Sequence, residues 1–237
     1  MIHGKSTEGT EDAAGLSRLR RTGAWIFDLD NTLYPSSAGM FEKIDRRMCA
    51  FIADYLAIDA AAAYRVQKSY FREHGTTLKG LMDRHGMDPG PYLEYVHAVD
   101  LEGVAPAPAL AQALAKLPGR KLVFTNASAE HARRILARLG IAAFFDGIFD
   151  IAAADFIPKP DPGTYAKLVR DFALEPAATV MVEDVARNLG PAAAIGMTTV
   201  WVENDRPWAR ADHALIEPDF TVGDLAAWLA RVASTDG

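Results

Sequence analysis

The sequence predicts an α/β fold, and three observations carry that prediction. Short apolar runs of strand length stop at polar residues, amphipathic helical patterns alternate with the later runs, and a long helical stretch separates the first run from the second. Strands that alternate with helices are typical of a parallel sheet, because each parallel strand is reached through a crossover. We therefore expect a Rossmann-like parallel sheet core with an inserted α-helical domain.

The expected strands are five short apolar runs. They carry few charges, which fits strands that are buried on both faces of a sheet. The runs are Ala24 to Asp30, Lys121 to Asn126, Gly147 to Asp150, Thr179 to Asp184 and Thr198 to Glu203. Helical patterns over Ala129 to Leu139, Pro162 to Leu174 and Val185 to Ile195 lie between the later runs and complete the alternation.

The expected insertion lies between the first two strands. They are about ninety residues apart, far more than one crossover needs. Apolar residues recur there at three and four spacing, typical of amphipathic helices. We expect a helical domain over residues 36–116, a core over 22–35 and 117–237, and a flexible tail over 1–21, which is rich in Gly, Ser, Thr and charge.

Composition and charge exclude several classes of protein. The chain has 237 residues, of which 50% are hydrophobic and 24% charged, as in a globular protein with a buried core. Its net charge of −6 supplies no field that draws nucleic acid or anionic membrane, and no apolar run approaches the roughly 18 residues of a membrane span. Cys49 is the single cysteine, so we expect no disulfide and a cytoplasmic location. The sequence does not indicate an oligomeric state.

Polar residues gather where the expected strands end. They are Asp28, Asp30, Thr125, Asn126, Glu183 and Asp184, with Lys159 between two prolines in a loop. The carboxyl ends of parallel strands meet at one edge of the sheet, where ligands bind. Four carboxylates at one edge repel one another unless a cation offsets them, and oxygen ligands favour Mg²⁺ over zinc or copper. The sequence therefore predicts a magnesium site at this edge.

The two acidic residues after the first strand can have different catalytic roles. Asp28 and Asp30 point to the same side of the chain. A metal-bound Asp28 stays ionised and can act as nucleophile, while Asp30 can hold and deliver a proton. Phosphoryl transfer needs a nucleophile, cations and fixed hydrogen-bond donors. Asp28, Mg²⁺ with Lys159, and Thr125 with nearby backbone N–H groups supply these, so the pattern favours phosphoryl transfer.

Taken in order, these motifs resemble the four motifs of haloacid dehalogenase-like (HAD) phosphatases, over nearly the whole chain from Ala24 to about Trp228. The resemblance implies that Asp28 forms an aspartyl-phosphate. It also implies that Asp30 protonates the leaving oxygen and later activates water. In the dehalogenases of this superfamily the second acid of the first motif is absent, so Asp30 argues for phosphate chemistry.

The same resemblance implies the ligands of the site. Thr125, with Asn126 beside it, and Lys159 would hold the phosphoryl group. The Mg²⁺ ligands would be the Asp28 carboxylate, the backbone carbonyl of Asp30 and the Asp184 carboxylate. Glu183 would lie in or next to that ligand shell. The insertion corresponds to the helical cap of the family.

A closer resemblance concerns the substrate. The string from Asp28 to Ser37 and the segment from His74 to Leu81 look most like the pyrimidine 5′-nucleotidase branch of the superfamily. This implies a pyrimidine nucleoside 5′-monophosphate as substrate. In the second segment we expect Thr76, Thr77 and Lys79 to offer hydrogen-bond donors to the leaving group.

Other readings stay open. The chain is alternatively a phosphatase for another small phosphorylated metabolite, or a sugar phosphomutase that uses the same aspartyl-phosphate. A non-catalytic phospho-switch resembling a receiver domain also has Asp, Thr and Lys at strand ends, but the insertion and Asp30 argue against it. The six histidines, His97 and His131 included, show no metal-ligand spacing, and we assign them no catalytic role.

Overall fold

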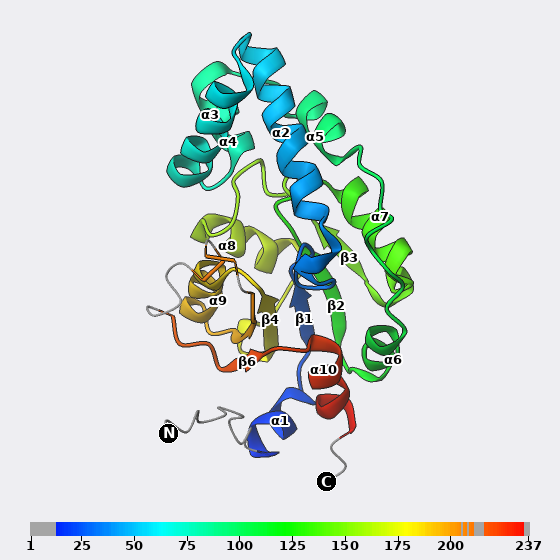
Figure 1. The fold of residues 1–237 in the computed structure, drawn as a ribbon. Helices are drawn as coiled ribbons and strands as arrows, with labels where there is room; N and C mark the ends of the chain where they lie inside the picture. Colours follow the sequence, from blue (N-terminus) through cyan, green and yellow to red (C-terminus); the bar gives the residue numbers. More distant parts are fainter. Residues whose placement is uncertain (1–12, 205, 208, 211–215, 235–237) are drawn as a thin grey trace, which may run out of the picture.

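The computed structural model describes the chain except residues 1–12, 205, 208, 211–215 and 235–237. Its core is a parallel sheet of six strands in the order β3-β2-β1-β4-β5-β6, which confirms the predicted α/β fold (Figure 1). The strands are β1 (Ala24–Phe27), β2 (Arg120–Phe124), β3 (Gly147–Phe149), β4 (Thr179–Glu183), β5 (Thr198–Val202) and β6 (Phe220–Val222). The edge strand β6 was not expected from the sequence.

Helices cover both faces of this sheet. Side chains alternate along β1, so Trp25 and Phe27 pack in one core cluster and Ile26 in the other. The first cluster is closed by α6 (Pro108–Lys116), α7 (Ala129–Leu139) and α10 (Leu225–Ser234), and the second by α8 (Pro162–Asp171) and α9 (Leu189–Ala194). Short 3-10 helices are η1 (Ser36–Ala38), η2 (Ala142–Phe144), η3 (Pro176–Ala178) and η4 (Ala186–Asn188).

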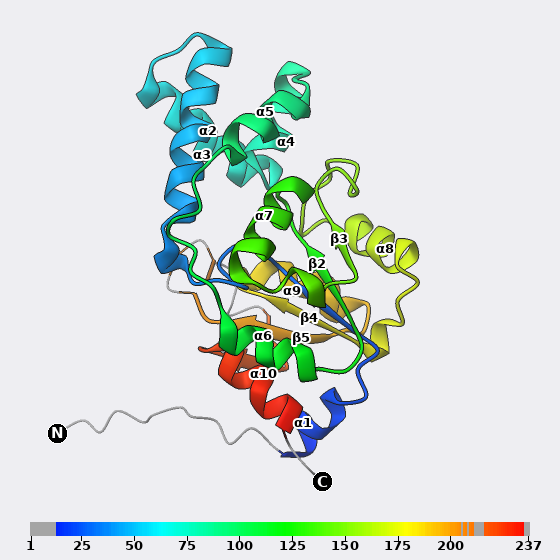
Figure 2. The ribbon, with the colours of Figure 1, turned by 90° about the vertical axis from the view of Figure 1, so that its right-hand side faces the viewer.

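Four helices between β1 and β2 form a separate group, which we call the cap bundle. They are α2 (Met40–Leu56), α3 (Ala60–His74), α4 (Thr77–His85) and α5 (Pro89–His97). The side chains of Asp59, Thr76 and Asp88 accept backbone N–H bonds at the starts of α3, α4 and α5, which explains where these helices begin. The cap bundle stands beyond the carboxyl ends of the strands (Figures 1 and 2).

Two helices differ from the arrangement expected at the domain boundaries. Residues 108–116 were expected in the helical domain, but α6 packs against α10 beside the sheet, because its apolar face meets the core there. Within the expected tail, α1 (Ala13–Leu19) is helical and buries Leu16 and Leu19 against the core. Residues 1–12 of that tail lie outside the described residues, and the predicted boundaries otherwise stay predictions.

None of the described helices is long and apolar enough to cross a membrane.

Candidate active site

The site lies at the carboxyl ends of the three central strands. β1 pairs with β2 on one side and with β4 on the other, so the residues that follow these strands meet at one edge. Asp28 follows β1 directly, and its N–H donates to Val182 O at 2.9 Å. The chain then turns sharply at Asn31, whose φ of 65° lies in the left-handed region that asparagine tolerates.

Three carboxylates and one ammonium are buried together here. Oxygen atoms of Asp28, Glu183 and Asp184 lie within 4.8 Å of one another. The Lys159 ammonium, itself 2% exposed, donates to Asp28 Oδ1 at 2.7 Å and to Glu183 Oε2 at 2.6 Å. It also donates to the carbonyl oxygen of Phe124, the last residue of β2, at 2.9 Å. The structure thus brings these four predicted site residues into one cluster.

The cluster contains fewer cationic groups than carboxyl groups. Burial and the neighbouring Glu183 raise the pKa of Asp28 to about 7, and burial with the same neighbour raises the pKa of Asp184 as well. Burial opposes the charge on Lys159, but Asp28 and Glu183 together raise its pKa. One ammonium therefore faces three carboxyl groups, and if all three are ionised two negative charges are left without an offset. A divalent cation fits this donor set, which consists of oxygens only.

The two acidic residues after β4 have different partners. Glu183 is ion-paired with Lys159 through Oε2 and accepts the Val185 N–H through Oε1 at 3.1 Å. The Asp184 carboxylate accepts from two neutral groups of the described part of the chain, Asn204 Nδ2 at 2.5 Å and Thr32 Oγ1 at 3.4 Å, and no Lys or Arg of that part pairs with it. Asp184 is therefore the freer of the two to face a cation.

Thr125 and Asn126 lie beside this cluster at the end of β2. Thr125 is 2% exposed, and its Oγ1 accepts the Ala127 N–H at 3.0 Å. The Asn126 side chain is engaged with the lysine loop, because Oδ1 accepts the Lys159 N–H at 2.9 Å and Nδ2 donates to Lys159 O at 3.4 Å. The Asn126 side chain thus holds the Lys159 backbone in place. The predicted contact of Asn126 with phosphate stays a prediction.

Asp30 lies next to the cluster and is held through one oxygen. Tyr34 OH donates to Asp30 Oδ1 at 2.5 Å, and His131 Nε2 lies 3.2 Å from the same atom. Burial alone would raise the pKa of Asp30, but His131 and the Tyr34 hydroxyl lower it below its ordinary value. No hydrogen bond from the described part of the chain reaches Oδ2, so this oxygen of the ionised Asp30 is the one free to exchange a proton with a bound substrate.

His131 and His97 were assigned no role from the sequence, yet both lie behind Asp30. Their rings stack with centroids 4.5 Å apart, and His131 is fully buried. Burial and the neighbouring His131 lower the pKa of His97 to about 3, so the His97 ring is neutral at ordinary pH. His131 stands in the first turn of α7 and His97 ends α5, so the contact joins the cap bundle to the core.

A cavity of about 520 Å³ extends from the carboxylate cluster into the cap bundle. Thr76 and Thr77 line it, but both hydroxyls already serve the fold, since Thr76 caps α4 and Thr77 donates to Gln67 O at 3.3 Å. Lys79 is ion-paired with Asp83 and is not among the lining residues. The expectation that Lys79 reaches the leaving group is therefore not met.

Comparisons with known proteins fit this geometry. Residues 23–196 match the family model of haloacid dehalogenase-like hydrolases. Phosphate metabolism protein 8 of Saccharomyces cerevisiae is 30% identical over 191 residues, which are 73% of this chain, and the chain spans 59% of the length of that protein. Glyceraldehyde 3-phosphate phosphatase of Methanopyrus kandleri is 30% identical over 198 residues, 77% of this chain and 84% of the relative.

Solved structures share the fold at lower sequence identity. A HAD phosphatase from Thermococcus onnurineus is 17% identical with a TM-score of 0.58, over 90% of this chain and 98% of that one. An L-2-haloacid dehalogenase from Xanthobacter autotrophicus is 19% identical with a TM-score of 0.55, over 91% of this chain and 100% of that one. Both cover the sheet and the cap bundle together.

Proposed function

The chain belongs to the haloacid dehalogenase-like hydrolase family, and from this premise we propose that it is a Mg²⁺-dependent phosphomonoester hydrolase with Asp28 as nucleophile. The observation that carries the proposal is the buried cluster of Asp28, Glu183 and Asp184 around Lys159. The presence of Asp30 two residues after the nucleophile favours phosphate esters over haloacids as substrates. The Methanopyrus kandleri relative, a phosphatase by name, supports the same reaction class.

In the first step Asp28 attacks the phosphorus atom of the ester. Lys159 holds Oδ1 of Asp28, which leaves Oδ2 to form the new P–O bond while the ester P–O bond breaks. Lys159 and the Thr125 hydroxyl lie at the strand ends, where they would contact the phosphoryl oxygens. The product of this step is an aspartyl-phosphate together with the leaving alcohol.

Asp30 moves the protons. In its protonated form Asp30 gives the proton from Oδ2 to the leaving oxygen, so that a neutral alcohol departs and the Asp30 carboxylate is left. The same oxygen then takes a proton from the water that attacks phosphorus, which releases inorganic phosphate and restores Asp28. Tyr34 and the His131 ring keep Asp30 in place by holding Oδ1 throughout.

The residues present fit a divalent cation. The carboxylates of Asp28 and Asp184 and the backbone carbonyl of Asp30 would hold Mg²⁺, with Glu183 paired to Lys159. Bound there, Mg²⁺ would offset charge on the phosphoryl oxygens and on the carboxylates. Without such a cation, ionisation of all three carboxylates would leave two uncompensated negative charges in a buried site, which is why the pKa values of Asp28 and Asp184 are raised there.

The substrate predicted from the sequence, a pyrimidine nucleoside 5′-monophosphate, stays a prediction, because neither relative named above carries that activity in its name. A cytoplasmic location, which the single cysteine predicts, also stays a prediction.

The test of the proposed function is release of inorganic phosphate with Mg²⁺ from p-nitrophenyl phosphate, UMP, CMP, AMP, GMP and small sugar and triose phosphates. We expect release that a chelator abolishes and Mg²⁺ restores.

Two results of this assay would contradict the proposal. Release of phosphate that a chelator leaves unchanged would exclude the metal site. Absence of release, with phosphoryl transfer to a sugar phosphate in the presence of a sugar bisphosphate activator, would identify a phosphomutase. Equal rates with purine and pyrimidine nucleotides, or faster rates with sugar phosphates, would exclude only the pyrimidine nucleotidase assignment.

A further inference from the structure

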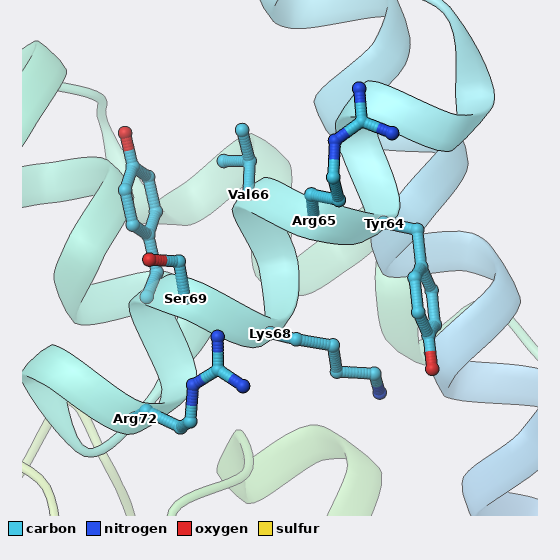
Figure 3. Close-up of a pocket in the computed structure, with 7 residues that line it drawn as sticks. Tyr64, Arg65, Val66, Lys68, Ser69 and Arg72 are labelled. Atoms are coloured by element: carbon cyan, nitrogen blue, oxygen red, sulfur yellow. The ribbon is translucent and has the colours of Figure 1, made fainter.

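Two arginines line the same cavity as Asp28 and Lys159 without a place in the chemistry described so far. Arg72 belongs to α3 of the cap bundle, and Arg187 belongs to η4 of the core, three residues after Asp184. They therefore reach the cavity from its two walls. Figure 3 shows a second pocket along α3, which Arg72 lines together with Lys68 and Arg65.

Neither arginine forms an ion pair with a carboxylate of the described part of the chain, although a hydrogen bond from Ser69 and the charges of Arg84, His74 and Arg72 lower the pKa of the Glu73 carboxyl. Two neighbouring cations, by contrast, are paired. Lys68 pairs with Asp45 at 2.6 Å, and Arg206 pairs with Glu42. The Arg187 guanidinium lies over the Phe71 ring, with Cζ 5.1 Å from the ring centroid, and so reaches the residue next to Arg72. Its buried Nε finds no acceptor among the described residues. Both arginines thus line the cavity, Arg187 with a buried donor that has no acceptor among the described residues and Arg72 with an exposed side chain.

The transferred phosphoryl group does not need these arginines. Lys159 stands at the strand ends, where the phosphoryl group would bind, while Arg72 approaches from the cap bundle on the leaving-group side. A guanidinium binds carboxylate or phosphate through paired N–H bonds, and two of them facing one space repel each other unless an anion lies between. The cavity of about 520 Å³ leaves room for a small leaving group with a charged end.

We propose that the substrate is a phosphate ester whose leaving group carries a second anionic group, a carboxylate or a second phosphate, bound by Arg72 and Arg187. This inference rests on the proposed function and deepens it. It differs from the nucleoside 5′-monophosphate predicted from the sequence, because the leaving group of such a nucleotide is uncharged. Closure of the cap bundle over the substrate would bring the two guanidinium groups onto the same anion.

The test uses matched pairs of substrates with Mg²⁺. One pair, 3-phosphoglycerate and glycerol 3-phosphate, differs in a carboxylate, and the other, fructose 1,6-bisphosphate and fructose 6-phosphate, in a phosphate. We expect kcat/KM to favour the more anionic member of one pair by about tenfold or more, as one charge-assisted hydrogen bond allows. The pair that shows the preference tells carboxylate from phosphate.

Variants assign this preference to the two arginines. Arg72→Gln and Arg187→Gln should each remove it and should lower turnover of p-nitrophenyl phosphate far less, and Arg187→Lys should keep part of it. Arg65→Gln is the matched control, because Arg65 is an exposed arginine of the same helix that does not line the cavity. A preference that survives both glutamine variants, or no preference in either pair, would overturn the inference.

Failure of the proposed function is recognised separately. If wild-type protein releases phosphate from none of the phosphate esters named above, the hydrolase proposal fails, and calorimetry still tests the anion site. Binding of 3-phosphoglycerate or fructose 1,6-bisphosphate that is tighter than that of its matched partner, and that Arg72→Gln weakens, would support the site. Equal affinities within both pairs would overturn it.

Discussion

The Nε2 atom of His131 lies 3.2 Å from Oδ1 of Asp30, although 101 positions separate the two residues in the sequence. The Tyr34 hydroxyl donates to the same oxygen, so both partners leave Oδ2 free for proton transfer. Behind His131 stacks His97, whose Nδ1 lies 3.0 Å from Ser128 Oγ. The orientation of the proposed acid therefore depends on a buried pair of histidines that spans the cap bundle and the core.

Replacement of His131 should slow the chemical step more than it weakens substrate binding. We expect His131→Ala to lower kcat on an alkyl phosphate by about tenfold or more with little change in KM, because Asp30 loses one of its two fixed partners. p-Nitrophenyl phosphate, whose leaving group needs little protonation, should lose less. His131→Gln keeps a donor and should recover part of the loss. Equal losses on both substrates would show that His131 only supports the fold.

Removal of the acid itself should affect both steps of the reaction. Asp30→Asn cannot give a proton to the leaving oxygen, so formation of the aspartyl-phosphate should slow by about a hundredfold or more on an alkyl phosphate and less on p-nitrophenyl phosphate. Hydrolysis of the intermediate should slow with either substrate. Single-turnover experiments measure both rates. Equal damage to the first step with both substrates would contradict the role of Asp30.

Metal binding should stabilise the protein more at high pH than at low pH. Burial and Glu183 raise the pKa of Asp28 to about 7, so below that pH the metal-free folded protein holds a proton that Mg²⁺ must displace. The increase in Tm on adding Mg²⁺ should therefore be larger at about pH 8 than at about pH 5.5. An increase that is the same at both pH values, or larger at the lower one, would exclude competition between proton and metal in this cluster.

The two acidic residues after β4 should contribute unequally to metal affinity. Glu183 is ion-paired with Lys159, whereas the Asp184 carboxylate accepts from the neutral groups of Asn204 and Thr32 and pairs with no Lys or Arg among the described residues. Asp184→Ala should therefore weaken Mg²⁺ binding more than Glu183→Ala does, as measured by titration calorimetry. The reverse order would place Glu183 in direct contact with the metal.

The site residues that directly follow strands could be predicted from the sequence. Strands buried on both faces leave continuous apolar runs, and parallel strands bring their carboxyl ends to one edge, so proximity of Asp28, Thr125 and Asp184 followed from counting strands. The same reasoning applied to β5 would have found Asn204, which lies two residues beyond that strand and donates to Asp184. The sequence feature that predicts these site positions is the polar residue after each strand.

Other features depend on packing that periodicity does not encode. His97 and His131 meet because α5 of the cap bundle rests on the first turn of α7, and nothing in local spacing fixes that contact. The position of α6 beside α10 follows from the shape of the sheet core, since its helical pattern alone suits either neighbour. One sequence feature could have pointed to His131, namely its place in the first turn of the helix that follows β2.

The central claim, that Asp28 is the nucleophile, is tested most directly by the rate of inorganic phosphate release from p-nitrophenyl phosphate with Mg²⁺. Asp28→Asn should fold normally and lose activity by about a thousandfold or more, since the amide that replaces the carboxylate cannot act as the nucleophile. Asp54→Asn, at an exposed carboxylate of α2, is the matched control and should keep wild-type activity. Activity of folded Asp28→Asn above about a tenth of the wild-type rate would contradict the account.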